Sequence, residues 1–214
     1  NYIKNFIDPA GAAVRAGGAL YSTFRRNIVS NCAGYGLDAL DAYAPDPSVV
    51  YYGINHGLSE QNVWGARMGG IRVEGLLTSI CDDFELHLDG EAAVVVGGTV
   101  STTLNMQTPY FELSLGNAAA LIGIKQYGST RIHINGGQIF GEAIDSPGSV
   151  AILSSTGYGM TVIGVVFARW ETALKGAVAD AMPLLVGGNY FAHCGTINAL
   201  NASGADVSLF HVPE

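Results

Sequence analysis

Short stretches of alternating apolar and polar residues recur along the chain. The clearest are Phe84–Gly90, Phe111–Gly116 and Arg131–Gly136. A period of two residues is typical of a β-strand with one buried face. The side chains predicted to point inward are Leu86, Leu88, Leu113, Leu115, Ile132 and Ile134. Two other segments, Val94–Val96 and Leu184–Val186, are wholly apolar and predict strands that are covered on both faces.

A five-residue phrase with Phe in its fourth position occurs three times in the second half of the chain. It stands at Gly137–Gly141, Gly164–Ala168 and Gly188–Ala192, so that its period lies in the twenties. Self-similarity at such a period, with strand-like residues in each unit, indicates a solenoid. The phrase predicts that Phe140, Phe167 and Phe191 stack inside the molecule.

Short strands with Gly at the turns favour an all-β parallel β-helix, a solenoid, over a sandwich of antiparallel hairpins. Asp89-Gly90 and Asn135-Gly136 are hairpin turn pairs, so the sandwich stays open as an alternative. The nearest helical pattern is Ala168–Ala181, where Gly176 and the strand-like surroundings weaken it. No Leu-x-x-Leu-x-Leu pattern is present.

We expect one domain over residues 1–214. Residues 1–30 read as an irregular opening or cap segment, with a strand at Phe24–Cys32. Residues 41–48 contain Pro45 and Pro47 and read as a loop insertion.

Aligning the three alternating strands by their shape predicts a polar surface. Glu112 follows Glu85 by one long rung, and Arg131 follows Glu112 by a shorter one, so the rungs are irregular, at about 19–27 residues. Stacked in one sheet, these strands would give three outward columns. The columns are Glu85, Glu112 and Arg131; His87, Ser114 and His133; and Asp89, Gly116 and Asn135.

Two carboxylates one rung apart suit acid–base chemistry on a sugar, because retaining glycosidases place such a pair roughly 5 Å apart. The leading catalytic candidates are Glu85 and Glu112, with Asp83 and Asp89 in reserve. The candidate substrate-binding residues are His87, Arg131, His133, Asn135 and Tyr110. The alternative interpretation is a solvated strand face, since outward polar residues are expected on any half-buried strand.

Two further acidic groups have weaker support. Glu142, Asp145 and Glu171 follow successive turns and could form another edge. Asp82 and Asp83 read together as a solvated turn.

Charge and cysteine content narrow the class of protein. The net charge of −8 argues against nucleic acid as a partner. No apolar run reaches 18 residues, so no membrane insertion is expected. The sparse cysteines Cys32, Cys81 and Cys194 predict buried free thiols and no disulfide framework. We expect no metal and no cofactor.

Irregular rungs, Gly-x-x-Phe-Ala turns, Asn-Cys or His-Cys pairs and Gly-rich alternating strands together resemble pectate-lyase-like proteins. Within that family the chain looks most like a bacteriophage tailspike or capsule depolymerase, over roughly residues 20–210. The resemblance implies a right-handed single-stranded parallel β-helix and a homotrimer. It also implies a polysaccharide ligand, acidic catalytic residues, and an extracellular location or one on the virion surface.

Three functions remain open from the sequence. One is a polysaccharide-cleaving glycoside hydrolase, with a lyase as second choice. The second is a non-catalytic carbohydrate-binding or receptor-binding module, and the third is a structural spike segment. A hydrophobic content of 49% favours an oligomer in every case.

Overall fold

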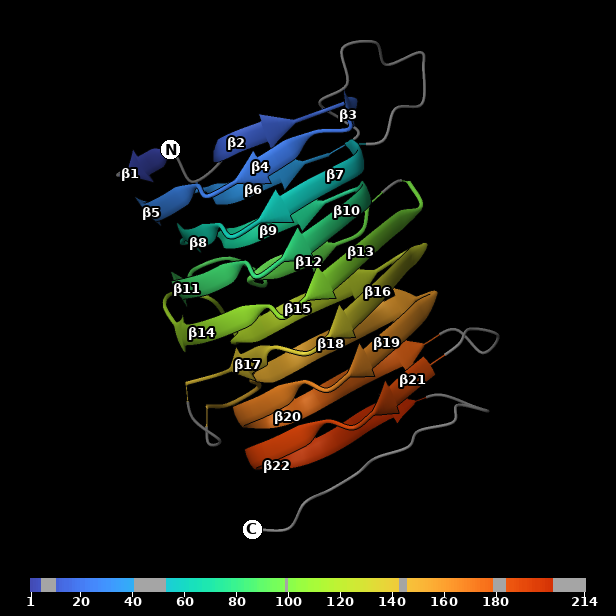
Figure 1. Ribbon diagram of the computed structural model, residues 1–214. Helices are drawn as coiled ribbons and strands as arrows, with labels where there is room; N and C mark the ends of the chain where they lie inside the picture. The colour runs from blue at the N-terminus through green and yellow to red at the C-terminus, as the bar shows by residue number, and fades with distance from the viewer. Residues whose placement is uncertain (5–10, 41–52, 99, 143–145, 179–183, 202–214) are drawn as a thin grey trace.

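The computed structural model describes residues 1–4, 11–40, 53–98, 100–142, 146–178 and 184–201. These residues form strands β1 to β22 and no helix, and every strand pairing among them is parallel. The strands lie one above another from the N-terminus to the C-terminus (Figure 1). The chain is therefore an all-β molecule of large parallel sheets, and the antiparallel sandwich is excluded for its described part.

A 14-stranded sheet has two arms that meet at β20. The first arm consists of β1 (Tyr2–Lys4), β5 (Ile28–Cys32), β8 (Val63–Ala66), β11 (Asp83–Leu88), β14 (Tyr110–Leu115) and β17 (Gln138–Phe140). The second arm consists of β2 (Ala12–Ala16), β6 (Tyr35–Ala39), β9 (Gly69–Val73), β12 (Val94–Val96), β15 (Ile122–Tyr127) and β18 (Val150–Gly157). The long strand β20 (Val166–Val178) pairs with β17 through its first half and with β18 through its second half, and β22 (Tyr190–Asn201) pairs with β20.

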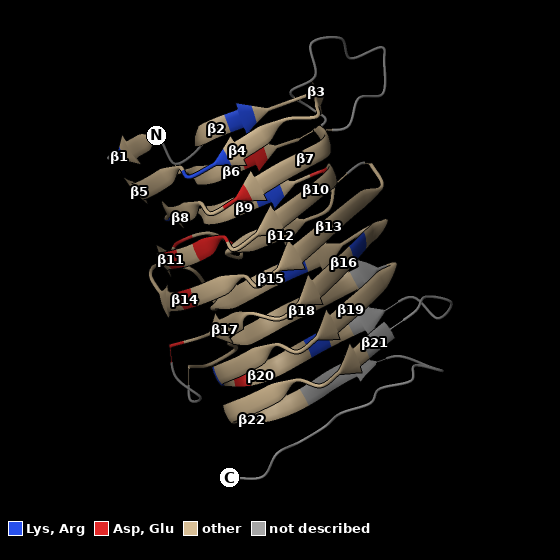
Figure 2. Ribbon diagram, in the orientation of Figure 1, with Lys and Arg blue, Asp and Glu red and all other residues tan. Residues whose placement is uncertain are grey.

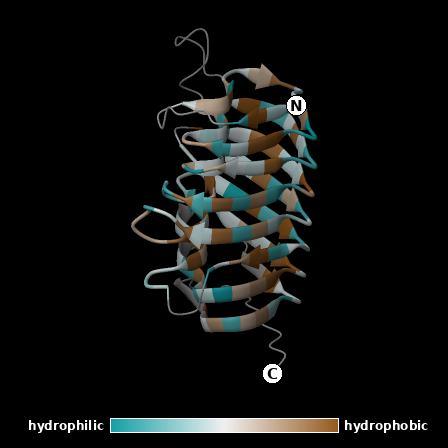
Figure 3. Ribbon diagram, turned by 90° about the vertical axis from the view of Figure 1, so that its left-hand side faces the viewer, coloured by the Kyte–Doolittle hydropathy of each residue, from teal (hydrophilic) through white to brown (hydrophobic). Residues whose placement is uncertain are grey.

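An eight-stranded sheet forms the remaining side of the molecule. Its strands are β3 (Ala19–Leu20), β4 (Thr23–Arg25), β7 (Ile54–Glu60), β10 (Gly75–Ile80), β13 (Thr102–Gln107), β16 (Thr130–Asn135), β19 (Gly159–Ile163) and β21 (Leu184–Gly187). Polar and apolar residues alternate along the stacked ribbons (Figure 3). The two arms and this sheet enclose a nearly closed apolar interior.

Aromatic and aliphatic side chains stack inside the first arm, one from each strand. Phe84 stacks on Phe111 with ring centroids 4.4 Å apart, and Phe167 stacks on Phe191 at 5.2 Å. Ile139 occupies the level between these pairs. The predicted inward leucines and isoleucines are also buried, apart from the half-buried Leu115.

The predicted stack was wrong for Phe140. Gln138 pairs with Val166 and not with Val165, so the first glycine phrase is displaced by one position relative to the other two. Phe140 therefore lies opposite Ala168 with its side chain half-buried, and Ile139 fills the place inside. A slip of one residue exchanges the inner and outer faces of a strand.

The turns before β5, β8, β11, β14, β17, β20 and β22 each contain one residue with left-handed backbone. It stands two positions before the strand, with φ between 46° and 68°. The seven residues are Arg26, Gln61, Cys81, Thr108, Gly136, Gly164 and Gly188. Only the last three are Gly, which adopts this conformation without strain. The recurring turn therefore covers more of the chain than the three glycine phrases indicate.

The spacing of this repeat varies more than predicted. The shortest step between equivalent strands of the first arm runs from Val63 to Asp83, and the longest runs from Ile28 to Val63. The expected short step from Glu112 to Arg131 does not occur, because the strand that follows β14 in the first arm is β17.

A buried hydrogen-bonded ladder follows these turns. The Asn62 backbone N–H donates to Asp82 Oδ1 (2.8 Å), and the Asn27 N–H donates to Asn62 Oδ1 (2.9 Å). At the other end of the molecule the Val165 N–H donates to Asn189 Oδ1 (2.8 Å). Asp82 is fully buried, so the interpretation of Asp82 and Asp83 as a solvated turn was wrong for Asp82. Its side chain caps a backbone N–H that would otherwise lack a partner.

Several other expectations need correction. The weak helical pattern at Ala168–Ala181 is the strand β20 up to Val178, and the stretch Phe24–Cys32 is divided between β4 and β5. Cys81 is exposed because it occupies a left-handed turn position, whereas Cys32 is buried, and all three thiols are free. The predicted loop at 41–48 and the acidic residue Asp145 lie outside the described residues.

Candidate functional site

The predicted register of the two carboxylate strands is confirmed. Glu85 pairs with Glu112 and His87 with Ser114 on the neighbouring strands β11 and β14 of the first arm. Parallel neighbours lie about 4.8 Å apart, so the two glutamates leave the sheet side by side. We call the outer surface formed by Asp83, Glu85, His87, Tyr110 and Glu112 the carboxylate face. Its acidic residues mark β11 and β14 in Figure 2.

The third member of each predicted column was wrong. Arg131, His133 and Asn135 belong to β16 of the eight-stranded sheet, where Arg131 pairs with Thr103 rather than Glu112. Phe140 takes the place beside Glu112. The strands have the same alternation, but they stand at different points of the repeat and so lie on different sides of the molecule. The structure thus divides the predicted patch into two surfaces.

One hydrogen bond within β14 and one between β14 and β11 fix side chains of the carboxylate face. The Tyr110 hydroxyl donates to Glu112 Oε2 (2.7 Å), and Ser114 Oγ lies 2.6 Å from His87 Nδ1. Glu85 and Asp83 have no side-chain hydrogen bond or ion pair with any described residue. These two carboxylates are therefore available to a ligand.

Asp83 is the carboxylate of this face whose pKa departs from its ordinary range. Partial burial raises the pKa of Asp83, and the neighbouring charges of Glu85 and Asp82 add to the increase. A carboxyl with a raised pKa keeps its proton to higher pH, which is the property of a general acid. The pKa of Tyr110 is also raised, first by its hydrogen bond to Glu112 and then by burial.

Asp89 is held by its neighbours. Its Oδ2 lies 2.6 Å from Arg67 Nε in an ion pair, and its Oδ1 accepts hydrogen bonds from Arg67 Nη2 (3.1 Å) and the Asn117 N–H (2.8 Å). The hydrogen bond from Arg67 is the main reason that the pKa of Asp89 is lowered. Asp89 is thus an anion that fixes the chain after β11, and it is poorly suited to donate a proton.

Glu142 and Glu171, the two described members of the second acidic group, accept hydrogen bonds from the backbone. Glu142 Oε2 accepts a hydrogen bond from the Leu115 N–H (2.8 Å), and Glu171 accepts one from the Gly148 N–H. Both carboxylates therefore stabilise turns.

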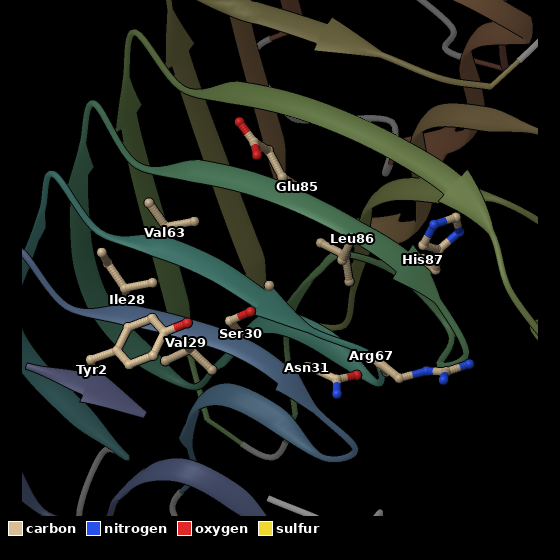
Figure 4. A pocket seen from close by; sticks show the side chains of 11 residues that line it. Tyr2, Ile28, Val29, Ser30, Asn31, Val63, Arg67, Glu85, Leu86 and His87 are labelled. Carbon is tan, nitrogen blue, oxygen red and sulfur yellow. The ribbon is translucent and has the colours of Figure 1, made fainter. Parts of the chain in front are cut away.

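A groove of about 560 Å³ lies beside the carboxylate face, over β5, β8 and β11, and shares Glu85 and His87 with it. Glu85 and His87 line one side, Tyr2 and Ile28 the other, and Arg67 lies at one end (Figure 4). The lining also includes Val29, Ser30, Asn31, Val63, Gly65 and Leu86. Gly65 contributes no side chain to the floor of the groove, where a Cβ would lie only 2.8 Å from the Val29 carbonyl oxygen.

The sequence analysis did not find Tyr2, Ile28, Gly65 or Arg67 as parts of this groove. They come from segments that precede Glu85 by irregular steps, so no fixed period connects them to it. The left-handed backbone of Asn31, with φ of 52°, is associated with a shift of register between β5 and β8. The one available signal was the outward position of Ile28 and Val63 on their strands. Both are in register with Asp83, which places them on the same surface as the carboxylates.

The groove joins an apolar wall to a wall of carboxylate, imidazole and guanidinium groups. Such a mixture can bind the C–H face and the hydroxyls of a sugar, and Glu85 can exchange a proton with it. Among the described residues no group of His, Cys, Asp and Glu side chains is arranged to hold a metal ion, and no helix is long and apolar enough to span a membrane. Comparison with protein-family models, curated proteins and solved structures finds no match to this chain.

Proposed function

We propose that the chain is a right-handed single-stranded parallel β-helix, of the pectate-lyase-like and tailspike kind, that binds a bacterial surface polysaccharide along the carboxylate face. The parallel pairing of each strand with the equivalent strand of the next repeat supports this architecture. So do the seven left-handed turns and the buried ladder beside them, because repeating turns and stacked polar side chains are what a solenoid requires.

We further propose that the protein cleaves this polysaccharide as a glycoside hydrolase. The observation that carries the proposal is the in-register pair Glu85 and Glu112, with Glu85 on the wall of a groove and without a side-chain partner among the described residues. Adjacent strands bring two such carboxylates into the range of about 5 Å that retention of configuration requires.

The residues divide the chemistry between them in this mechanism. Glu112 donates its proton to the glycosidic oxygen as the bond to the leaving sugar breaks, and Asp83, whose pKa is raised, is the reserve proton donor. Glu85 attacks or stabilises the positive charge that develops on the sugar ring, and water then completes hydrolysis. Tyr110 positions Glu112 through its hydrogen bond, while His87 and Arg67 contact sugar hydroxyls or acidic groups.

Self-association is part of the proposal. Large apolar side chains outside the groove are exposed at the N-terminal end of the molecule, at Leu20 (60%) and Tyr21 (71%). Exposed apolar groups of this kind are covered in oligomers, which fits a homotrimer at a virion or cell surface. Analytical ultracentrifugation would give three chains per particle if this is correct.

A panel of capsule and O-antigen polysaccharides tests the function. We expect new reducing ends without ultraviolet absorbance, and we expect Glu85→Gln to abolish them while binding persists. Ultraviolet absorbance from unsaturated uronates would show that the protein is a lyase and not a hydrolase. Binding without cleavage would mean that the chain is a recognition module. If the protein neither binds nor cleaves any of these polysaccharides, only the structural role remains.

A further inference from the structure

A second groove, of about 510 Å³, lies on the outer surface of the eight-stranded sheet, over β10, β13, β16 and β19. Its polar lining consists of Thr78, Asn105, Gln107, His133, Asn135 and Thr161, which we call the amide groove. Met106, Ile134 and Ile163 complete the lining. No Asp, Glu, Lys or Arg belongs to it, in contrast to the groove beside Glu85.

Strand register arranges the polar residues in two parallel rows. One row passes from Thr78 through Asn105 and His133 to Thr161, one residue from each of the four strands. The other row passes from Gln107 to Asn135 and ends at Ile163. The first row is half-buried and the amides of the second row are exposed, so the first row forms the floor and the second an edge.

These six side chains have no hydrogen bond to one another or to any other residue in the described part of the chain. Amides, hydroxyls and an imidazole both donate and accept hydrogen bonds, as sugar hydroxyls do. On the carboxylate face, by comparison, Tyr110 is hydrogen-bonded to Glu112 and Ser114 to His87. The amide groove therefore presents a regular series of unused donors and acceptors.

The groove carries no formal charge at neutral pH. Burial, and to a smaller extent the nearby charge of Arg131, lowers the pKa of His133, which favours its neutral imidazole. Arg131 itself is exposed and lies outside the lining. An anionic ligand would find no positive charge in the lining to offset its loss of hydration. An uncharged polar ligand can bind without desolvating a charge.

We propose that the amide groove is a second binding site, for an uncharged, hydroxyl-rich glycan that lies across the strands. One sugar unit of an extended glycan is comparable in length to the strand spacing of about 4.8 Å, so successive units can meet successive side chains of each row. The exposed side chain of Ile163 offers an apolar contact to the C–H groups of the rings. The site does not depend on cleavage at Glu85 and goes beyond the function proposed above.

Nuclear magnetic resonance of the side-chain amides tests this site on the intact chain. Maltohexaose, cellohexaose and mannohexaose would each be titrated to millimolar concentration. We expect at least one of them to shift the amide signals of Asn105, Gln107 and Asn135. The double variant Asn105→Ala/Asn135→Ala should weaken that binding at least about tenfold, because two hydrogen-bonding groups are removed.

Matched variants separate the two proposals. Gln138→Ala removes an exposed amide from β17, on the first arm, and should leave hexasaccharide binding unchanged. Glu85→Gln should also leave it unchanged, even if it abolishes cleavage. If the alanine double variant fails to fold, the exposed Gln107→Ala supplies the same test with one group removed.

The inference is overturned if none of the three glycans shifts these amide signals. It is equally overturned if the shifts centre on the carboxylate face. A change in sedimentation of the alanine double variant, without any glycan effect, would identify the groove as a contact between copies of this chain and would also reject the proposal.

Discussion

The carboxylate face and the amide groove are formed by strands with the same alternating pattern, yet their polar side chains are used differently. On β11 and β14 most polar groups are bonded to neighbours, as in the pairs Tyr110–Glu112 and His87–Ser114. On β10, β13, β16 and β19 the six polar groups of the groove have no partner among the described residues. The first surface holds Glu112 and His87 in place and leaves only Asp83 and Glu85 available, whereas all six polar groups of the second are available to a ligand.

Charge reinforces the contrast. Asp83, Glu85 and Glu112 concentrate negative charge over two neighbouring strands, and the charge of Glu85 adds to the effect of burial in raising the pKa of Asp83. The amide groove has an uncharged lining in which only His133 can titrate. The comparison indicates that alternation selects the exposed positions, whereas the chemistry of a surface depends on which strands become neighbours.

The largest expected effect distinguishes the two surfaces in catalysis. The double variant Glu85→Gln/Glu112→Gln should lower the rate of polysaccharide cleavage by about 10³-fold, because acid–base groups contribute on the order of 10²–10⁴-fold. Asn105→Ala/Asn135→Ala should leave the rate on a short substrate within about twofold, since distant sites act independently. Equal losses in both variants, measured as new reducing ends, would contradict the separation of the surfaces.

The second prediction compares a buried amide with an exposed one. Asn62 lies in the buried ladder, where its side chain bonds to Asn27, Ser59 and Asp82. We expect Asn62→Ala to lower the free energy of unfolding by about 2–4 kcal/mol, as several buried groups lose partners. The exposed Gln107→Ala should change it by less than about 0.5 kcal/mol. Urea unfolding of both variants measures the difference, and similar losses would show that Gln107 has a structural role.

The third prediction concerns two aspartates with opposite pKa shifts. Burial raises the pKa of Asp82, so its contribution to stability is full below the unfolded pKa and is lost as the pH rises through the folded value. Asp82→Asn keeps the Oδ1 acceptor of the ladder without the buried charge and replaces the Oδ2 acceptor of Ser79, so we expect it to raise the free energy of unfolding at pH 7. The gain should shrink toward acidic pH.

Asp89 is the matched control for this measurement. Its pKa is lowered, mainly by Arg67, so its contribution is present at neutral pH and is lost as the pH falls through the folded pKa. Asp89→Asn should therefore lower the melting temperature at pH 7. Thermal unfolding of both variants from neutral to acidic pH would disprove the assignment if Asp82→Asn were the more destabilising.

The smallest expected effect is that of the Tyr110 hydroxyl. Tyr110→Phe removes one hydrogen bond to Glu112, which is worth about 0.5–1.5 kcal/mol. Cleavage should fall by no more than about tenfold, with little change in stability. A loss as large as that of Glu85→Gln, in the same reducing-end assay, would mean that Tyr110 touches the reacting sugar.

Much of the local structure was predictable from residue patterns. The strands β11, β14 and β16 were predicted from their alternation, and the pairing of Glu85 with Glu112 follows from two strands of nearly identical shape. The stack of Phe167 on Phe191 follows from the glycine phrase. Assignment of Arg131 to the same column failed because similarity of pattern does not reveal which side of the molecule a strand occupies.

The sequence by itself determined the strands, their inward faces and the existence of a repeat, because alternation and glycine are local properties of the chain. The tertiary structure decided the length of each repeat, since Arg26, Gln61, Cys81 and Thr108 adopt the left-handed turn without being Gly. It also decided that Asp82 is buried and that Glu85 and His133 lie on separate surfaces. Those outcomes depend on which strands hydrogen-bond to one another, and repeats of such unequal length leave that choice to the packing of the whole interior.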